Sequence, residues 1–142
     1  MNDCPRVPLD LAQKAEDLLR QSPVNSWHFK SKEFLLANTN SPWVVAFSGG
    51  ADSLLILLLV YAAFPEIRDQ LTIAHFNHNL RGDESNKDAI FVEEIASRLQ
   101  LKIKLGRAES ITKTDEGTLR EQRRVFYQET IKGTGATVLI QG

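Results

Sequence analysis

The stretch "VVAFSGGADSLLILLLVYAAF", residues 44–64, decides the fold class of this 142-residue chain. Two apolar runs flank a short segment of small and polar residues, Ser48–Ser53. The first run predicts a short strand over Trp43–Phe47, and the second predicts a buried helix over Asp52–Phe64. The sequence therefore places a strand, a tight turn and a helix in immediate succession.

The alternation of strands and helices continues to the end of the chain. Further strands are predicted at Leu71–His75, Leu101–Leu105 and Ala136–Gln141, with helices at Ser85–Gln100 and Thr118–Lys132 between them. This order is typical of a parallel sheet with helices on both faces, so we expect a three-layer, doubly wound α/β fold. The strand "LKIKL" alternates as a strand near a sheet edge does. Ligands of such sheets bind at the carboxyl ends of the strands, where the strand order reverses.

Two shorter helices are expected before the first strand, at Leu9–Arg20 and Trp27–Ala37. The loop Asn38–Pro42 contains residues that break regular structure. We therefore divide the chain into an N-terminal helical extension with its linker, residues 1–42, and the first part of an α/β domain, residues 43–142.

Capping patterns predict where the two later helices begin and end. Ser85 with Asp88, and Thr118 with Glu121, have the spacing of a capping box. Gly133 is expected to end the second of these helices.

Composition and charge exclude several classes of protein. Hydrophobic residues make up 42% of the chain and charged residues 25%, as in ordinary soluble domains. The net charge of −1 excludes a polycation, so nucleic acid would contact a local patch or a part of the protein outside this chain. The single cysteine, Cys4, favours a reducing compartment such as the cytoplasm. No signal-peptide pattern opens the chain, and the run Leu54–Phe64 is too short to span a bilayer, so no membrane contact is expected.

The segment "SGGADS" predicts a phosphate-binding loop. It opens a helix, where unpaired N–H groups and the positive end of the helix dipole attract anions. Gly49 and Gly50 leave the backbone accessible and permit positive φ, while the hydroxyls of Ser48 and Ser53 can donate hydrogen bonds. Asp52 would repel phosphate unless a cation lay between them, so we expect it to bind Mg²⁺. The spacing excludes a Walker A loop and a nucleophile elbow; an ordinary capped turn is the alternative.

The same string, after a hydrophobic strand, resembles the SGGxDS signature of the PP-loop, or N-type, ATP pyrophosphatases. The resemblance implies that the chain binds ATP through its β- and γ-phosphates, transfers AMP to a carbonyl-type oxygen and releases pyrophosphate. It implies ATP contacts for the whole segment, namely Ser48, Gly49, Gly50, Ala51, Asp52 and Ser53. Asp52 is then both the metal ligand and a catalytic residue.

A second motif, "HFNHNLRGDES", begins within the second predicted strand. By residue type, His75 and His78 are either a pair of zinc ligands or hydrogen-bonded loop residues, and Asn77 can bond its own loop. Arg81 suits a phosphate or carboxylate, or is a solvated loop charge. As a string, the segment resembles the H-x-N-H-x-L-R-G-x-x-S motif of the tRNA(Ile)-lysidine synthetases, a PP-loop group. This resemblance implies nucleotide contacts for His75, Asn77 and His78, and a catalytic role for Arg81.

A third segment, "LREQRRVFYQ" at 119–128, is similar to the E-x-x-x-R-x-x-R-Y helix of the same group. Arg123 matches the first arginine and Tyr127 the tyrosine, which implies a catalytic role for Arg123. Two positions depart from the pattern: Phe126 replaces the second arginine, and Leu119 replaces the acidic residue. A solvated basic helix face is the alternative interpretation of the arginines.

The resemblance implies a reaction that uses ATP, Mg²⁺, L-lysine and the isoleucine tRNA, tRNA(Ile), with the anticodon CAU. The C2 carbonyl oxygen of the wobble cytidine would be adenylated, and the lysine side-chain amine would then displace AMP. The attacking amine must be neutral, so its pKa must fall or a base must lie near; His75 and His78 are candidates for that base. The oligomeric state stays open.

In that group the strand after the arginine helix leads into "GHHxDDQxET", whereas this chain stops at "IQG". We therefore expect a fragment that holds part of the ATP site, without tRNA-binding domains and with little or no lysidine-forming activity by itself. Two other functions stay open. One is another PP-loop ligase, such as a tRNA thiolase or an amidotransferase-type ligase, although thiolases often use paired cysteines. The other is a non-catalytic adenine-nucleotide-binding module, which would not need Asp52.

Overall fold

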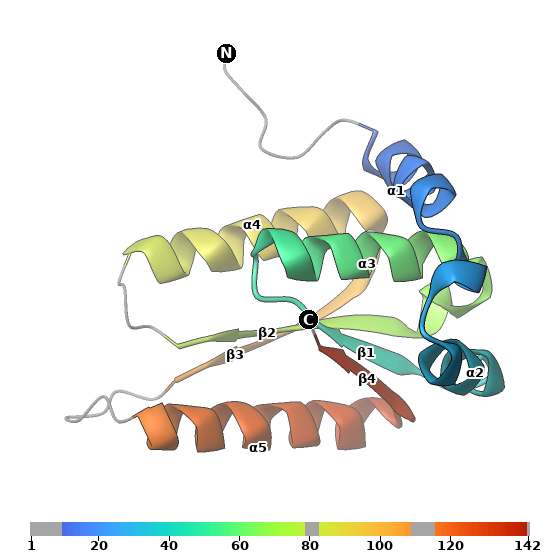
Figure 1. Ribbon diagram of the computed structural model, residues 1–142. Coiled ribbons are helices and arrows are strands. Elements are labelled where there is room, and N and C mark those ends of the chain that lie inside the picture. Colours follow the sequence, from blue (N-terminus) through green and yellow to red (C-terminus); the bar gives the residue numbers. More distant parts are fainter. Residues whose placement is uncertain (1–9, 79–82, 109–115, 142) are drawn as a thin grey trace, which may run out of the picture.

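The computed structural model describes residues 10–78, 83–108 and 116–141. Its centre is a four-stranded sheet flanked by helices (Figure 1). The strands are β1 (Trp43–Ala46), β2 (Leu71–Asn77), β3 (Lys102–Arg107) and β4 (Val138–Gln141). All neighbouring pairs are parallel, in the order β3-β2-β1-β4, so the predicted α/β fold is confirmed.

Helices cover both faces of the sheet (Figure 1). Helices α3 (Ala51–Ala63) and α4 (Asp83–Leu99) lie together on the first face, and α5 (Glu116–Thr134) lies on the second. The chain moves from β1 to β2 to β3 in one direction, and α5 then returns it to the far side of β1, where β4 pairs. The strand order therefore reverses between β1 and β4, at the point where the segment Ser48–Ser53 follows β1.

Two more helices precede the sheet: α1 (Leu11–Gln21) and α2 (Phe29–Ala37), joined through the 3₁₀ helix η1 (Val24–Ser26). Their residues Leu11, Ala15 and Leu35 belong to the same hydrophobic core as the strands. The division of the chain at residue 42 stays a prediction. Within the described residues no helix has the length and apolar character needed to cross a membrane.

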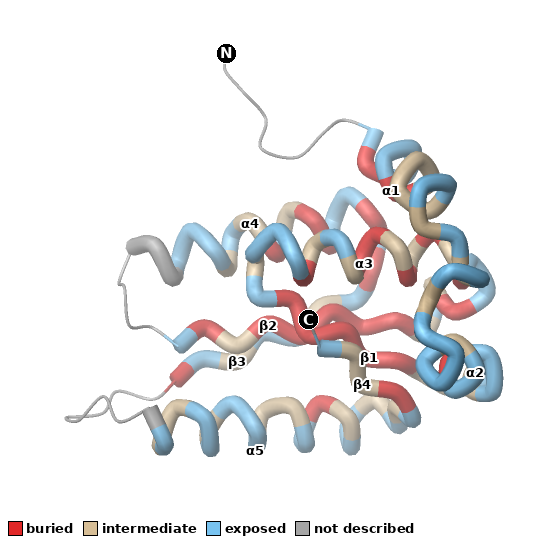
Figure 2. The backbone as a smooth tube through the Cα atoms, in the orientation of Figure 1, coloured by how far each residue is buried: buried red, intermediate tan, exposed pale blue. Residues whose placement is uncertain are grey.

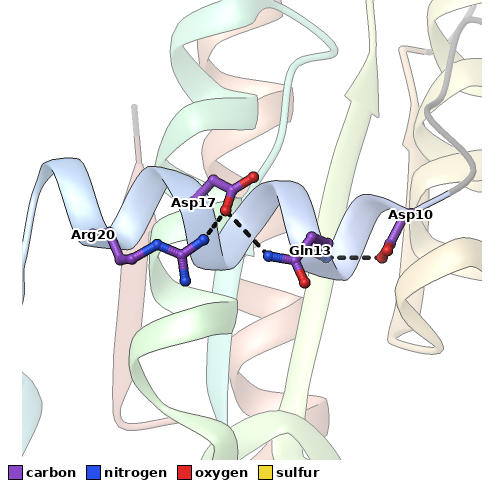
Figure 3. A network of polar contacts seen from close by, with 4 residues as sticks. All are labelled: Asp10, Gln13, Asp17 and Arg20. Atoms are coloured by element: carbon purple, nitrogen blue, oxygen red, sulfur yellow. Dashed lines mark hydrogen bonds and ion pairs between the residues drawn. The ribbon is translucent and has the colours of Figure 1, made fainter.

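Polar residues of α1 cap the start of the helix and contact one another along its exposed face (Figure 3). Asp10 is the N-cap, and its carboxylate accepts a hydrogen bond from the backbone N–H of Gln13 at 3.0 Å. Asp17 accepts one from the Gln13 side chain at 3.1 Å and pairs with Arg20. These contacts lie on the exposed face, while Leu11 and Ala15 face the core.

The central strands are buried along most of their length, whereas the edge strand β3 is largely exposed (Figure 2). Burial on both faces is expected where helices cover both sides of a parallel sheet. The edge position predicted for "LKIKL" is confirmed, and its Lys102 and Lys104 are exposed. A second 3₁₀ helix, η2 (Pro65–Gln70), leads into β2 and buries Ile67 completely.

Both predicted capping boxes are wrong, because α4 and α5 each begin two residues before the expected cap. Ser85 and Thr118 therefore lie inside the helices. Glu121 instead pairs with Arg124, one turn further along α5, and both side chains are exposed.

The predicted end of α5 is also displaced. Gly133 lies inside the helix, which continues to Thr134. Gly135 follows with φ of +72°, the left-handed conformation in which glycine ends helices at no steric cost. Strand β2 runs two residues longer than predicted, to Asn77, so this residue belongs to the sheet rather than to the loop after it.

Candidate functional site

The Ser48–Ser53 loop joins β1 to α3 at the carboxyl end of the sheet. Gly49 has φ of +94°, a conformation that glycine permits, whereas Gly50 is the N-cap of α3 with φ of −85° and does not use that freedom. A Cβ at Gly49 would meet Asp88 of α4 at an ordinary 3.6 Å. The backbone conformation, rather than crowding, therefore requires glycine at this position.

The two serines of the loop hold each other in place. The Ser53 hydroxyl donates to the Gly50 carbonyl at 3.1 Å, so the hydrogen between the two hydroxyls, 3.0 Å apart, comes from Ser48. Ser53 also accepts from the Ser48 backbone N–H, and Ser48 from that of Gly50. Both hydroxyl hydrogens are thus used within the loop. The backbone N–H groups of the first turn of α3, beginning at Ala51, remain without partners inside the helix and are the natural anion donors.

Asp52 lies in the first turn of α3, with its side chain exposed. A carboxylate beside an anion-binding helix start offers the hard oxygen ligands that Mg²⁺ prefers. Among the described residues no group of three or more histidine, cysteine, aspartate or glutamate side chains forms a metal site. The alternative of zinc at His75 and His78 therefore gains no further ligand from the part of the chain that is described.

The end of β2 places the second motif beside the loop. His75 is buried, and its Nδ1 lies 2.8 Å from the carbonyl oxygen of Phe47, the residue before the loop. Asn77 is buried as well, and its amide donates to Asn86 of α4 at 3.4 Å. His78 is exposed at the strand end. Arg81 lies outside the described residues.

Helix α5 brings its arginine and tyrosine to the same place from the other face of the sheet. Arg123 and Tyr127, one turn apart, both line two neighbouring cavities. The first cavity, about 300 Å³, is lined by Ser48, His75, Phe76, Asn77, His78, Asp88, Leu119, Arg120, Arg123 and Tyr127. The second cavity, about 240 Å³, is lined by Ala46, Ser48, Ser53, Arg123, Tyr127 and Gln141.

The second cavity lies where the strand order reverses. Ala46 ends β1 and Gln141 ends β4, and the two are direct partners in the sheet. Burial raises the pKa of Tyr127 above its ordinary value, although the charge of Arg123 opposes this. The tyrosine hydroxyl is therefore a hydrogen-bond donor at neutral pH. An arginine, a tyrosine and two serines around one small hollow form a place for an anion.

A profile of the PP-loop domain family matches residues 23–142. The chain belongs to the PP-loop domain family. The resemblance carried by "SGGADS" is thus confirmed at the level of the family, and the matched region includes α2 as well as the sheet.

Two relatives of this PP-loop chain carry the same name. A tRNA(Ile)-lysidine synthase of Rhodopirellula baltica is 34% identical over 113 residues, which cover 65% of this chain and 28% of that protein. One of Dehalococcoides mccartyi is 32% identical over 114 residues, which cover 75% of this chain and 24% of that protein. The matched segment thus spans about a quarter of the length of these relatives.

Among solved structures, the NH3-dependent NAD synthetase from Campylobacter jejuni, in complex with the nitrate ion, is similar with a TM-score of 0.48 and 17% identity. The match covers 91% of this chain and 54% of that one.

The PP-loop site brings together most, but not all, of the predicted residues. Ser48, His75, Asn77, His78 and Arg123 surround the first cavity, and Ser53 joins Ser48 and Arg123 at the second. The remaining described members, which line neither of these two cavities, are Gly49, Gly50, Ala51 and Asp52. They form the turn and the helix start next to the cavities.

Gln141 and Asp88 are among the residues of this site that sequence reasoning missed. Gln141 reaches it because β4 pairs with β1, and Asp88 reaches it because α4 passes beside Gly49. The rule that ligands bind at the carboxyl ends of strands could have found Gln141, the last described residue of its strand.

The structure also explains one departure from the family pattern. Phe126, at the position of the second arginine, packs beneath Gly106 of β3, so closely that a Cβ at Gly106 would overlap the ring. Its ring also lies 5.8 Å from that of Phe76. In this chain the position serves packing between α5 and the sheet rather than anion binding.

Proposed function

We propose that this chain forms the phosphate-binding part of the ATP site of a tRNA(Ile)-lysidine synthase. The observation that carries the proposal is the Ser48–Ser53 loop at the start of α3, faced by Arg123 and Tyr127 across the point where the strand order reverses. Membership of the PP-loop family and the names of the relatives support it. The motif "HFNHNLRGDES" adds support for this group of PP-loop enzymes.

In this proposal the β- and γ-phosphates bind the backbone N–H groups at the start of α3. Arg123 places a positive charge opposite them, where pyrophosphate develops negative charge as it leaves. Asp52 would hold Mg²⁺, which when bound neutralises part of that charge. His75, Asn77 and His78 line the cavity beside the loop and would contact the nucleoside. The catalytic role of Arg81 stays a prediction, because this residue lies outside the described part of the chain.

The substrates beyond ATP rest on the names of the relatives. L-lysine would be the nucleophile and the CAU-anticodon tRNA(Ile) the acceptor, in a cytoplasmic enzyme. With a net charge of −1, the chain offers little general attraction for RNA, so we place most of the tRNA contact outside it. We expect little or no lysidine formation by the chain alone.

Isothermal titration of Mg²⁺-ATP into the chain tests the site, with two glycines as a matched pair. Gly49 and Gly135 both have positive φ, so alanine at either position strains the backbone. Only Gly49 lies in the loop. We expect Gly49→Ala to lower ATP affinity at least tenfold, through displaced N–H donors, and Gly135→Ala to leave it unchanged. Equal affinities in the two variants would place the nucleotide elsewhere.

Omitting Mg²⁺ tests the role of Asp52. The wild-type chain should bind ATP more tightly with Mg²⁺ than without it, and Asp52→Asn should remove most of that difference. The control is Asp69→Asn, which removes a different carboxylate. Asp69 lies in η2, far from the loop in the sequence. A metal dependence that survives Asp52→Asn contradicts the assignment.

The lysine assignment is tested by comparing nucleophiles. Release of AMP from ATP with tRNA(Ile) is measured with lysine, ammonia or sulfide, for the chain and for a chimera in which it replaces the matching segment of the Rhodopirellula baltica relative. We expect release only by the chimera and only with lysine. Release driven by ammonia or sulfide would favour another PP-loop ligase, and turnover by the chain alone would contradict its expected inactivity.

A further inference from the structure

His75 is a buried histidine with one unsatisfied nitrogen. Only 3% of the residue is exposed. Its Nδ1 is bonded to the Phe47 carbonyl, but among the described residues its Nε2 is buried without a hydrogen-bond partner. A buried polar atom without a partner lowers the stability of a fold, so such atoms in native proteins call for an explanation, a bound ligand being one.

The bond to Phe47 fixes the chemistry of the other nitrogen. A carbonyl oxygen can only accept, so Nδ1 is the donor and carries a hydrogen. In the neutral ring Nε2 then holds a lone pair and is a hydrogen-bond acceptor. The missing partner of the neutral ring is therefore a donor, such as a hydroxyl or an amino group.

The position of His75 restricts which donor can reach it. Phe47, its partner, directly precedes Ser48, and both His75 and Ser48 line the first cavity. The histidine is thus held next to the loop that we assign to the phosphates. In a nucleotide the ribose follows the phosphates, and its hydroxyls are donors, while the amino group of the base lies farther away.

We propose that Nε2 of His75 accepts a hydrogen bond from a ribose hydroxyl of the nucleotide whose phosphates bind the Ser48–Ser53 loop. The inference rests on the proposed ATP site and assigns it a means of selecting ribonucleotides. Because Nε2 is buried, little water competes with a hydrogen bond from the ribose hydroxyl to it, so the loss of that bond should lower the affinity for the nucleotide.

Two variants separate this role from that of a loop support. In His75→Asn the side-chain amide nitrogen can replace Nδ1 as the donor to Phe47, but no atom replaces Nε2. In His75→Phe both interactions are lost. Affinities for ATP, 2′-deoxy-ATP and 3′-deoxy-ATP are measured by isothermal titration for the wild-type chain and both variants, after thermal melts establish that each is folded.

The wild-type chain should bind one of the two deoxy analogues roughly three- to tenfold more weakly than ATP, the usual loss for one hydrogen bond. His75→Asn should bind ATP and that analogue equally. If the wild type does not distinguish the analogues, or if His75→Asn distinguishes them as the wild type does, the inference is wrong. If the wild type instead discriminates against inosine triphosphate and His75→Asn does not, the donor is the amino group of the base, and the ribose assignment is overturned.

A measurement on the wild-type chain alone avoids any dependence on the folding of the variants. The ¹⁵N resonances of the His75 ring should show Nδ1 as the protonated nitrogen without nucleotide, and Nε2 should shift on addition of ATP but less with the critical deoxy analogue. A protonated Nε2 and a bare Nδ1 would overturn the inference. A chain that binds ATP normally yet shows no effect at His75 would refute this step only, whereas a chain that does not bind ATP would refute the proposed function too.

Discussion

The two ends of the parallel sheet differ in what they are made of. At the amino end, Trp27 and Trp43 pack against Phe64, with ring centroids 6.2 and 5.0 Å from it. At the carboxyl end, serines, histidines and arginines surround two cavities. One sheet thus carries an apolar end, which stabilises the fold, and a polar end, which is available for chemistry. Changes at the first should alter stability, and changes at the second should alter ligand binding.

The largest effect is expected at the amino end. Trp43 is completely buried, and its indole N–H donates to the Asn38 carbonyl at 2.8 Å. Trp43→Ala should lower the free energy of unfolding by about 3–5 kcal/mol, because it leaves a cavity and an unpaired carbonyl. Since domains of this size are stable by only about 5–15 kcal/mol, much of the chain would unfold at 37 °C.

Urea denaturation measures this loss, with Trp27→Ala as the control. Trp27 contacts the same phenylalanine but is only half-buried, so its loss should be smaller. At a temperature where both variants are folded, both should bind ATP like the wild type. Weaker ATP binding by the folded Trp43→Ala protein would contradict the claim that the amino end of the sheet affects stability and not ligand binding.

The second prediction concerns a place where packing and site meet. Gly106→Ala on β3 should cost about 1–3 kcal/mol of stability, because the added methyl group would overlap the ring of Phe126. The strain should push α5 away from the sheet and move Arg123 and Tyr127, so ATP affinity should fall as well. Urea denaturation and isothermal titration on the same variant measure both losses.

A second substitution checks the cause. Phe126→Leu makes room beneath β3, so the double variant Gly106→Ala with Phe126→Leu should lose less stability than the sum of the single changes. Additive losses would mean that the ring is not the obstacle. A stable Gly106→Ala protein with normal ATP affinity would show that α5 does not transmit packing changes to the site.

The third prediction compares neighbouring arginines of α5. Arg123 lines both cavities, whereas Arg124 points to solvent and pairs with Glu121. Arg123→Ala should weaken ATP binding roughly tenfold, as expected for a charge-assisted hydrogen bond, and Arg124→Ala should leave it unchanged. Neither change should alter the unfolding midpoint much, since both side chains are exposed. Equal losses of affinity would mean that general positive charge, rather than the position of Arg123, attracts the nucleotide.

Several features at the carboxyl end could be predicted because they depend on neighbours in the sequence. The apolar run before Ser48 and the longer one after it predict a strand and a helix, and the loop between them must then lie at a helix start. The two glycines of the loop show the limit of such reasoning. Both permit positive φ, but only Gly49 adopts it, because Gly50 becomes the N-cap of the helix.

Other features depend on contacts between distant segments, which no local pattern contains. Gln141 joins the site only because α5 returns the chain to the free side of β1. Phe126 departs from the family pattern. Its packing role can be recognised only in the folded structure, where its ring lies against Gly106 of β3. The capping prediction at Thr118 followed a local spacing, but the helix start is decided by where the whole of α5 packs on the sheet.

The smallest effect is expected from the ion pair of Glu121 with Arg124, which lies on α5 near the polar end but outside the site. The hydrogen bond from Arg124 holds the pKa of Glu121 below its ordinary value of 4.5. A carboxylate with a lowered pKa contributes stability above that ordinary value, and the contribution is lost as the pH falls through the lowered pKa. Both groups are exposed, so water and salt screen most of it.

Thermal melts of the wild-type chain and Glu121→Gln between pH 3 and pH 7 check this. The two should differ slightly at pH 7 in low salt, and the difference should shrink as the pH falls through the lowered pKa of Glu121. High salt should remove the difference, and ATP affinity should be the same in both proteins. A large loss of stability at pH 7, or any loss of ATP affinity, would mean that this ion pair holds the arginines of α5 in position. The polar site would then include the outer surface of the helix.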